Sequence, residues 1–304
     1  MICAFIDANR DEHGVEPICR VLTEHRCPIA PSTYYDARNR PPSARTLRDE
    51  ELKTVISATH EENRSLYGAH KIWIALRRKG IDVARCTVER LMTELGLRGV
   101  LRGRAPRTTV ADPKADRAKD LVGRNFNPVA PNRLWVADFT YVHTLAGWVY
   151  VAFVIDAYAR RILGWKASNR MTTPLVLDAI NQAIWIRRGE GITDLSGVIH
   201  HNDAGSQYTS VAFTDRLIEV GIDASIGIVG DAHDNSLAES INGLYKTELI
   251  KRAGPWRDAA HVEAETADYL HWFNHDRLYE YCGDMPPIEC EQLHYSRHTG
   301  QQAS

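Results

Sequence analysis

The segment LWVADFTYV, residues 134–142, places a carboxylate in the middle of an apolar β-strand. Alternate residues of a strand point to opposite faces, and here neither face is polar, although Asp138 lies on one of them. A strand of this kind lies inside a sheet that other elements cover on both sides. Burying an unpaired carboxylate is costly, so Asp138 is expected to be protonated, paired or bound to a metal. A satisfied structural aspartate is the alternative for this residue taken alone.

The stretch that follows this strand predicts an α/β domain. Apolar and amphipathic segments alternate with turn residues in the order β-β-β-α-β-α-β-α. After 134–142 the predicted elements are strands at 147–159 and 160–168, a helix at 173–189, a strand at 198–201, a helix at 211–221, a strand at 222–228 and a helix at 236–250. We therefore predict an α/β fold of five strands with flanking helices.

The region before residue 127 is predicted to be separate and helical. Residues 46–97 contain three amphipathic segments, and the turn GIDV joins the last two. Two short helices joined by a tight turn match a helix-turn-helix, although any three-helix bundle has a similar pattern. The proline-punctuated stretch 28–45 is predicted to be a linker. The predicted domains are an N-terminal helical segment with its linker at 1–44, a helix-turn-helix region at 45–104, a basic linker at 105–126, an α/β core with a C-terminal helix at 127–296 and a disordered tail at 297–304.

Basic residues concentrate in the helix-turn-helix region. The chain has a formal net charge of -2, yet residues 64–107 carry eleven basic residues against three acidic ones. A basic block beside an acidic remainder indicates a polyanionic partner, and the helix-turn-helix pattern favours DNA. The candidate DNA-binding residues of this region are Lys71, Arg77, Arg78, Arg85 and Arg90.

Two more acidic residues lie where an α/β protein places functional groups. Asp203 follows the strand at 198–201, and chemistry in open α/β sheets gathers at such strand ends. A turn-forming aspartate is the alternative, because NDAGS is typical of a turn. Glu239 lies on the last predicted helix, where it forms the pattern S-x-x-E with Ser236, so a capping box is the alternative for this residue.

The helix that carries Glu239 has one polar face. At roughly 100° per residue, Glu239 shares that face with Asn235, Asn242 and Lys246. One carboxylate, two amides and one cation suit a site where a metal, a phosphate and a sugar meet. We therefore include Asn235, Asn242 and Lys246 among the candidate DNA-binding residues.

Asp138, Asp203 and Glu239 together predict a divalent-metal site. Two or three carboxylates gathered in one place cannot all ionise without a cation. Their hard oxygen atoms favour Mg²⁺ or Mn²⁺. A pair of such ions about 4 Å apart activates a water or a 3′-hydroxyl and stabilises the leaving oxygen of a phosphodiester. We expect two ions and assign the catalytic and metal-binding roles to these three residues.

The spacing and the surrounding sequence resemble a known family. Thirty-five residues separate Asp203 from Glu239, which resembles the D,D-35-E signature of retroviral integrases and related transposases. The segments that look like the second reading frame (OrfB) of IS-three-family insertion-sequence transposases are PNRLWVADFTYV, YVAFVIDAYARRILGW, HHNDAGSQYTS, DNSLAESINGLYKTELI and WFNHDRLYEYCGDMPPIE. The resemblance covers nearly the whole chain and includes YGAHKIWIALRRKG in the helix-turn-helix region.

The resemblance implies a ribonuclease-H-like fold, with a five-stranded mixed sheet and helices on both faces. It implies that the three acids bind two divalent ions and that Lys246 contacts DNA near the element end. The implied reaction is cleavage at the 3′ ends of the element and joining of the freed 3′-hydroxyl to target DNA. The implied partners are the terminal inverted repeats, target DNA, further copies in an oligomer on DNA, and the upstream-frame product as a frameshift fusion.

Two departures from the family pattern bear on activity. Family members commonly carry arginine directly after the second aspartate, and this chain has Ala204. The chain also lacks the upstream frame's helix-turn-helix and leucine zipper, so it is expected to be an incomplete transposase by itself. A catalytically impaired DNA-binding remnant or regulator of an insertion element is therefore the alternative function. A ribonuclease H acting on RNA–DNA hybrids is disfavoured by the basic N-terminal region.

The remaining residue types exclude other classes of protein. No apolar run approaches the roughly 20 residues that span a bilayer, and the N-terminus has no signal peptide, so we expect no membrane partner and a cytoplasmic, nucleoid-associated location. Six scattered cysteines without a C-x-x-C pair are interpreted as reduced thiols. His200, His201 and His233 are interpreted as polar groups behind the site or on the surface, because three carboxylates serve a hard metal.

Overall fold

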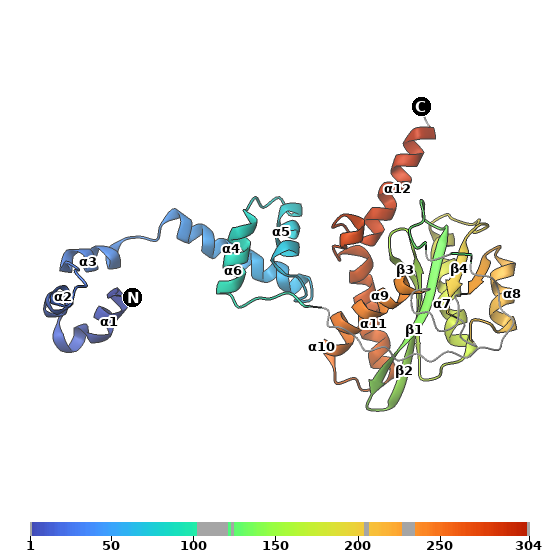
Figure 1. Cartoon of the computed structure of the whole chain (residues 1–304), viewed down its shortest axis with the longest axis horizontal. Helices are drawn as coiled ribbons and strands as arrows, with labels where there is room; N and C mark the ends of the chain where they lie inside the picture. Colours follow the sequence, from blue (N-terminus) through green and yellow to red (C-terminus); the bar gives the residue numbers. More distant parts are fainter. Residues whose placement is uncertain (1, 102–120, 123–124, 204–206, 227–234, 303–304) are drawn as a thin grey trace. The chain divides into compact units, whose positions relative to one another are not determined.

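The computed structural model of the chain describes residues 2–101, 121–122, 125–203, 207–226 and 235–302 (Figure 1). The chain divides into two compact units, residues 1–55 and 56–304. Within the described residues, no helix is both long enough and apolar enough to cross a lipid bilayer.

The first unit contains three short helices, which bury a small apolar core of their own, and the beginning of a fourth helix. The three short helices are α1 (Ile2–His13), α2 (Val15–Glu24) and α3 (Pro31–Asn39). Helix α3 lies inside the stretch 28–45, so the linker predicted there is wrong at this point. Pro31 is the first residue of α3, where the missing N–H of proline costs no intrahelical hydrogen bond.

The three helices predicted over 46–97 are confirmed. They are α4 (Ala44–Glu62), α5 (Ala69–Arg78) and α6 (Arg85–Glu94). Gly80 follows α5 with a φ of +77°, a left-handed conformation that glycine adopts at little cost. The Trp73 indole N–H donates a hydrogen bond to the Val83 carbonyl at 2.9 Å, which ties the turn to α5.

The second unit contains the predicted five-stranded sheet. Its strands are β1 (Leu134–Thr144), β2 (Gly147–Asp156), β3 (Arg161–Ser168), β4 (Ile199–Asn202) and β5 (Asp223–Ile226). The strand order is β3-β2-β1-β4-β5, with β1 antiparallel to β2 and parallel to β4, so the sheet is mixed and β1 is central. Strand β4 pairs with β1 only over Leu134–Ala137. In the described part of the chain, the edge of β1 beyond Ala137 therefore has no strand on the β4 side.

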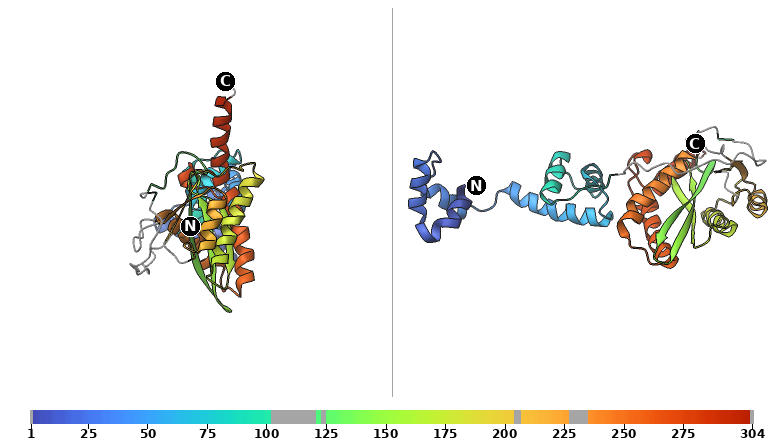
Figure 2. Two further views of the ribbon diagram at one scale, coloured as in Figure 1. Left: turned by 90° about the vertical axis from the view of Figure 1, so that its right-hand side faces the viewer. Right: turned by 60° about the horizontal axis from the view of Figure 1, so that its bottom comes forward.

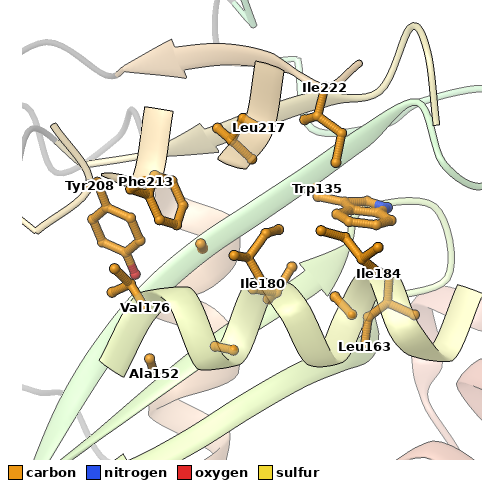
Figure 3. Packing of buried hydrophobic residues seen from close by; sticks show 14 of the residues in the cluster. Trp135, Ala152, Leu163, Val176, Ile180, Ile184, Tyr208, Phe213, Leu217 and Ile222 are labelled. Carbon is orange, nitrogen blue, oxygen red and sulfur yellow. The ribbon is translucent and has the colours of Figure 1, made fainter. Parts of the chain in front are cut away.

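Helices cover both faces of the sheet (Figure 2). Helices α7 (Thr173–Gly189) and α8 (Val211–Glu219) pack on one face, where Trp135, Ile180 and Phe213 belong to the main apolar core (Figure 3). Helix α7 lies very close to β3, because a Cβ added at Gly164 would stand 2.0 Å from the Ala179 carbonyl oxygen.

The opposite face of the sheet is covered by α9 (Ser236–Tyr245) and α11 (Ala259–His275). Helix α9 continues into a π-helical turn, η1 (Lys246–Ile250), and then α10 (Lys251–Ala253). After the short helix η2 (Glu280–Cys282), helix α12 (Pro287–Gln302) ends the described chain. The sequence predicted a disordered tail from residue 297, whereas α12 continues to Gln302 because no proline interrupts it.

A buried ionic network links the sheet to α7 and α12. Arg187 of α7 is fully buried and forms ion pairs with Asp156 at 2.9 Å and with Glu291 at 2.5 Å. Burial disfavours the charge of Arg187, but Glu291 and Asp156 hold the pKa of its guanidinium above the usual range. Arg161 of β3 also pairs with Glu291, at 2.9 Å. These pairs fasten α12 to the sheet through charged groups.

Candidate active site

Asp138 lies in β1 immediately after the last residue that pairs with β4. The Phe139 backbone N–H donates a hydrogen bond to one carboxylate oxygen at 2.8 Å, and the Asn242 side chain of α9 donates to the other at 2.7 Å. The Asp138 side chain is half-buried. The two hydrogen bonds, one from β1 and one from α9, fix its carboxylate from two sides. The alternative interpretation of Asp138 was an aspartate with a structural role whose hydrogen bonds are satisfied. These two hydrogen bonds are part of what that interpretation requires.

The electrostatic surroundings of Asp138 contain the two other predicted acids. Burial and then the neighbouring Asp203 charge raise the pKa of Asp138 to about 8. Glu239 raises this pKa further, whereas the hydrogen bonds from Phe139 and Asn242 lower it. Asp203 follows β4 and Glu239 lies in the first turn of α9, so three elements bring three carboxylates into one region.

The donor set of this region suits a hard divalent cation. The charges of Asp203 and Glu239 raise the pKa of Asp138 by repulsion, and a cation would remove that repulsion. In the described part of the chain, no three histidine, cysteine, aspartate or glutamate side chains are already arranged to hold a metal ion. The three acids fit the ion by charge and chemistry.

The start of α9 excludes the capping box, which was the alternative interpretation of Glu239. The helix begins at Ser236 with Asn235 as its N-cap residue, so Ser236 is the first helical residue and Glu239 lies one position too late for the motif. The Asn235 side chain instead donates a hydrogen bond to the Ala137 carbonyl at 3.0 Å. This bond joins the first residues of α9 to β1 directly beside Asp138.

Several buried polar atoms around the acids have no hydrogen-bond partner among the described residues. They include the side-chain oxygens of Asn235, Asn242 and Tyr208. Burial raises the pKa of the Tyr208 hydroxyl well above its usual value, and Asp138 and Asp203 add to this shift. Sequence reasoning missed Tyr208, although it lies in the segment HHNDAGSQYTS that carries the family resemblance.

The histidines of β4 are core residues. His200 and His201 are both buried, and His201 lies 2.9 Å from the Ser225 hydroxyl through Nδ1. Burial lowers the pKa of His200 to about 3, so this imidazole is neutral. His233 and Ala204 lie outside the described residues.

Lys246 lies at the start of η1, where it reaches the open edge of β1. Its ammonium is 4.4 Å from the centre of the Tyr141 ring, a cation–π contact. Burial lowers the pKa of Lys246, the charge of Asp138 opposes that shift, and Lys251 adds to it. The predicted DNA-contacting cation is therefore near both Asp138 and a second lysine.

The predicted cations of the helix-turn-helix region have intramolecular partners. The Lys71 ammonium donates to the Leu278 carbonyl at 2.8 Å, and Arg78 contacts Glu289 of α12. Arg77 lies over the Trp73 ring at 5.0 Å. On the surface of α6, Arg85 pairs with Glu89 at 2.8 Å and Arg90 pairs with Glu94 at 2.7 Å. Their DNA contacts stay predictions.

Comparison with protein families gives the class of this protein. A family model of the integrase core domain matches residues 128–232, and a second one matches residues 220–287. A model of an HTH-like domain matches residues 47–105. The five-stranded mixed sheet and these matches define a protein with an integrase-type core that follows a helix-turn-helix-like domain in the sequence.

Similar proteins give the particular family. One protein of Mycobacterium tuberculosis, assigned as a transposase for insertion sequence element IS986/IS6110, is 63% identical over 89% of this chain and 97% of its own length. The transposase for insertion sequence element IS629 of Shigella sonnei is 49% identical over 96% of each chain. The chain therefore belongs to the insertion-sequence transposases, which confirms the resemblance seen in its sequence.

Among solved structures, the magnesium complex of the HTLV-2 integrase catalytic core domain is similar to this chain. The two chains share 16% sequence identity, with a TM-score of 0.41, over 54% of this chain and 98% of that domain.

Proposed function

We propose that this protein catalyses metal-dependent cleavage at the ends of an insertion element and transfer of the freed 3′-hydroxyl to target DNA. Asp138, Asp203 and Glu239 are the catalytic and metal-binding residues in this proposal. The observation that carries it is the pKa of Asp138, raised to about 8 by burial and by two carboxylates on separate elements. A group of like charges around one partly buried carboxylate has a clear use in a transposase, because a divalent cation neutralises it.

The roles of the protein's own residues follow from their contacts. Divalent ions bound at the three carboxylates would supply activation of the attacking hydroxyl and stabilisation of the leaving oxygen. Asn242 orients the Asp138 carboxylate through its hydrogen bond, and Asn235 fixes the start of α9 beside β1. Lys246 holds a DNA phosphate near the open edge of β1.

The domain boundaries of the sequence analysis are retained as part of this proposal, except at α3 and at the end of α12. The helix-turn-helix region at 45–104 binds the terminal inverted repeats, and the core from 127 onward performs the chemistry. Copies of the chain assemble on DNA. The upstream-frame product joins the chain through translational frameshifting into one fused polypeptide.

Metal removal gives the direct test of the proposed function. Purified protein is incubated with a labelled duplex that ends in the element's terminal repeat and with plasmid as target. Joined products are expected with Mg²⁺ or Mn²⁺ and are expected to disappear with EDTA, because the carboxylates then lack their cation. The same assay with the fused polypeptide separates a missing upstream segment from a missing activity. No joining by either protein under any of these conditions would favour the DNA-binding remnant instead.

Replacement of Lys246 tests its proposed contact with a phosphate. In Lys246→Met the aliphatic stem remains on Tyr141 and the charge is lost. We expect weaker binding to the terminal duplex, with the slope of log K against log salt shallower by about 0.9, because one fewer counterion is released. Fluorescence anisotropy at several salt concentrations measures this slope. Lys166→Met, at a lysine that pairs with Glu263, is the matched control, and an unchanged slope in Lys246→Met would contradict the contact.

A further inference from the structure

Three aromatic side chains lie on one face of the hairpin formed by β1 and β2. Tyr141 faces Tyr150 across the two strands, and His143 faces Trp148. Residues directly opposite one another in an antiparallel pair point to the same side of the sheet, and so do alternate residues of one strand. Tyr141, His143 and Trp148 therefore share a face, and we call these three residues the aromatic platform.

The rings of the aromatic platform contact one another and remain open to solvent. The Tyr141 and Trp148 ring centres are 5.4 Å apart with planes at 81°, and those of His143 and Trp148 are 5.0 Å apart at 77°. Tyr141 is 47% exposed and Trp148 is 51% exposed. The platform therefore presents aromatic surface that the described residues leave uncovered.

The aromatic platform lies across the edge of β1 from the proposed catalytic site, because Tyr141 and Asp138 are three residues apart and point to opposite faces of the sheet. Strand β4 ends its pairing at Ala137, so the edge of β1 between Asp138 and Tyr141 has no neighbouring strand in the described part of the chain. The Lys246 ammonium lies over the Tyr141 ring at 4.4 Å, and its pKa responds to the charges of Asp138 and Lys251. One tyrosine therefore connects the aromatic surface to the cations beside the acids.

The end of the hairpin is held in place. The Leu145 backbone N–H donates to the Trp256 carbonyl at 2.8 Å, and the Ala146 N–H donates to the Arg257 carbonyl at 3.1 Å. These two bonds attach the hairpin to the segment between α10 and α11. The platform is thus presented by a fixed element rather than by a free loop.

We infer that the aromatic platform stacks an unpaired base at the end of the DNA substrate, across the edge of β1 from the carboxylate that acts on the strand. This inference rests on the proposed function. Exposed aromatic rings flanked by cations are the combination that binds single-stranded nucleic acid, because the rings stack on bases while the cations hold phosphates. Bases inside a duplex are already stacked, so the platform selects a nucleotide that has left its pair.

The test compares two duplexes of arbitrary sequence in EDTA, so that no strand is cut or joined. One duplex has a short single-stranded 5′ overhang with 2-aminopurine as its fluorescent base, and the other is blunt. Full-length Trp148→Leu and Tyr141→Leu are each expected to bind the overhang duplex about tenfold more weakly than the unchanged protein and to quench its fluorescence less. Binding to the blunt duplex is expected to stay the same. Tyr141→Phe keeps the ring and is expected to behave like the unchanged protein.

Trp185→Leu is the matched control for this experiment. Trp185 is a more exposed tryptophan, at 74%, and it lies on α7 next to Ile184, which packs near Trp135 at the start of β1 (Figure 3). Its replacement is expected to leave both duplexes bound as before. Thermal melting of each variant measures whether the fold is retained. We expect it to be retained, because Tyr141 and Trp148 are half-exposed.

Two results would overturn the inference. An equal loss on blunt and overhang duplexes would mean that the rings act on the DNA backbone or on the fold. Unchanged quenching together with reduced self-association in sedimentation would mean that the aromatic platform is an interface between copies of this chain. Because binding is measured without metal, a platform that behaves as expected in a protein that fails to join strands would contradict only the proposed function.

Discussion

Asp138→Asn is expected to reduce strand transfer by about a thousandfold or more while DNA binding is retained. The substitution keeps the shape of the side chain and its hydrogen bond from Phe139, but it removes the charge that holds a cation. Asp203→Asn and Glu239→Gln are expected to cause losses of the same size, because the three groups act as one unit. Joined product in a gel assay with Mn²⁺ measures the loss.

Asp178→Asn is the matched control for this series, because Asp178 is an exposed aspartate on α7. Its activity is expected to equal that of the unchanged protein. Joining of element ends at the normal rate by a Glu239→Gln protein would show that the metal-ligand assignment is wrong.

Asp138→Asn is also expected to change how the stability of the protein depends on pH. In metal-free protein the pKa of Asp138 is about 8, above the roughly 4 of an exposed aspartate, so the folded state binds this proton more tightly than the unfolded state. The free energy of unfolding therefore falls as the pH rises from about 4 to about 8. Asp138→Asn is expected to be at least as stable as the unchanged protein above pH 8, and urea unfolding at several pH values measures the difference.

Arg187→Met is expected to lower the free energy of unfolding by about 3–5 kcal/mol. Arg187 is fully buried, and its removal leaves Asp156 and Glu291 buried without their cation. Burial already raises the pKa of Asp156 even with Arg187 beside it, so the uncompensated charge would be costly. Urea unfolding followed by circular dichroism measures the change.

Arg188→Met is the control for this variant, because Arg188 is the exposed neighbour on the same helix. We expect it to change stability little. Combining Arg187→Met with Asp156→Asn and Glu291→Gln is expected to recover part of the loss, because the buried negative charges are then removed as well. A single Arg187→Met protein that melts like the unchanged one would contradict the role of the network.

Local patterns in the sequence were sufficient for much of the fold. The apolar run around Asp138 predicts a central strand, and β1 lies between β2 and β4. Periodicity predicts the order of strands and helices, because each element repeats its apolar residues at its own spacing. Prolines, which interrupt that spacing, were less reliable signs of where a linker lies. Prolines around α3 suggested a linker, although Pro31 only starts a helix there.

Part of the candidate site could likewise be predicted from the sequence, and part depends on the tertiary structure. The acids could be proposed from their positions on strand ends and a helix face, together with the family resemblance. Their mutual effect on the pKa of Asp138 depends on packing between β1, β4 and α9, which no local pattern contains. Tyr208 was missed for that reason, since a tyrosine in a turn segment carries no sign of the charges it will lie beside.

The sequence by itself determined the family and the α/β order and was sufficient to propose the three acids, because these depend on residue type and spacing along the chain. Only the tertiary structure decided which groups those residues contact. It turns Lys71 and Arg78 toward the C-terminal segment. It also ends the pairing of β4 at Ala137, so that among the described residues no strand lies beside β1 on that side from Asp138 to Tyr141. Strand register and contacts between distant segments follow from the packing of the whole core, and a local pattern does not encode them.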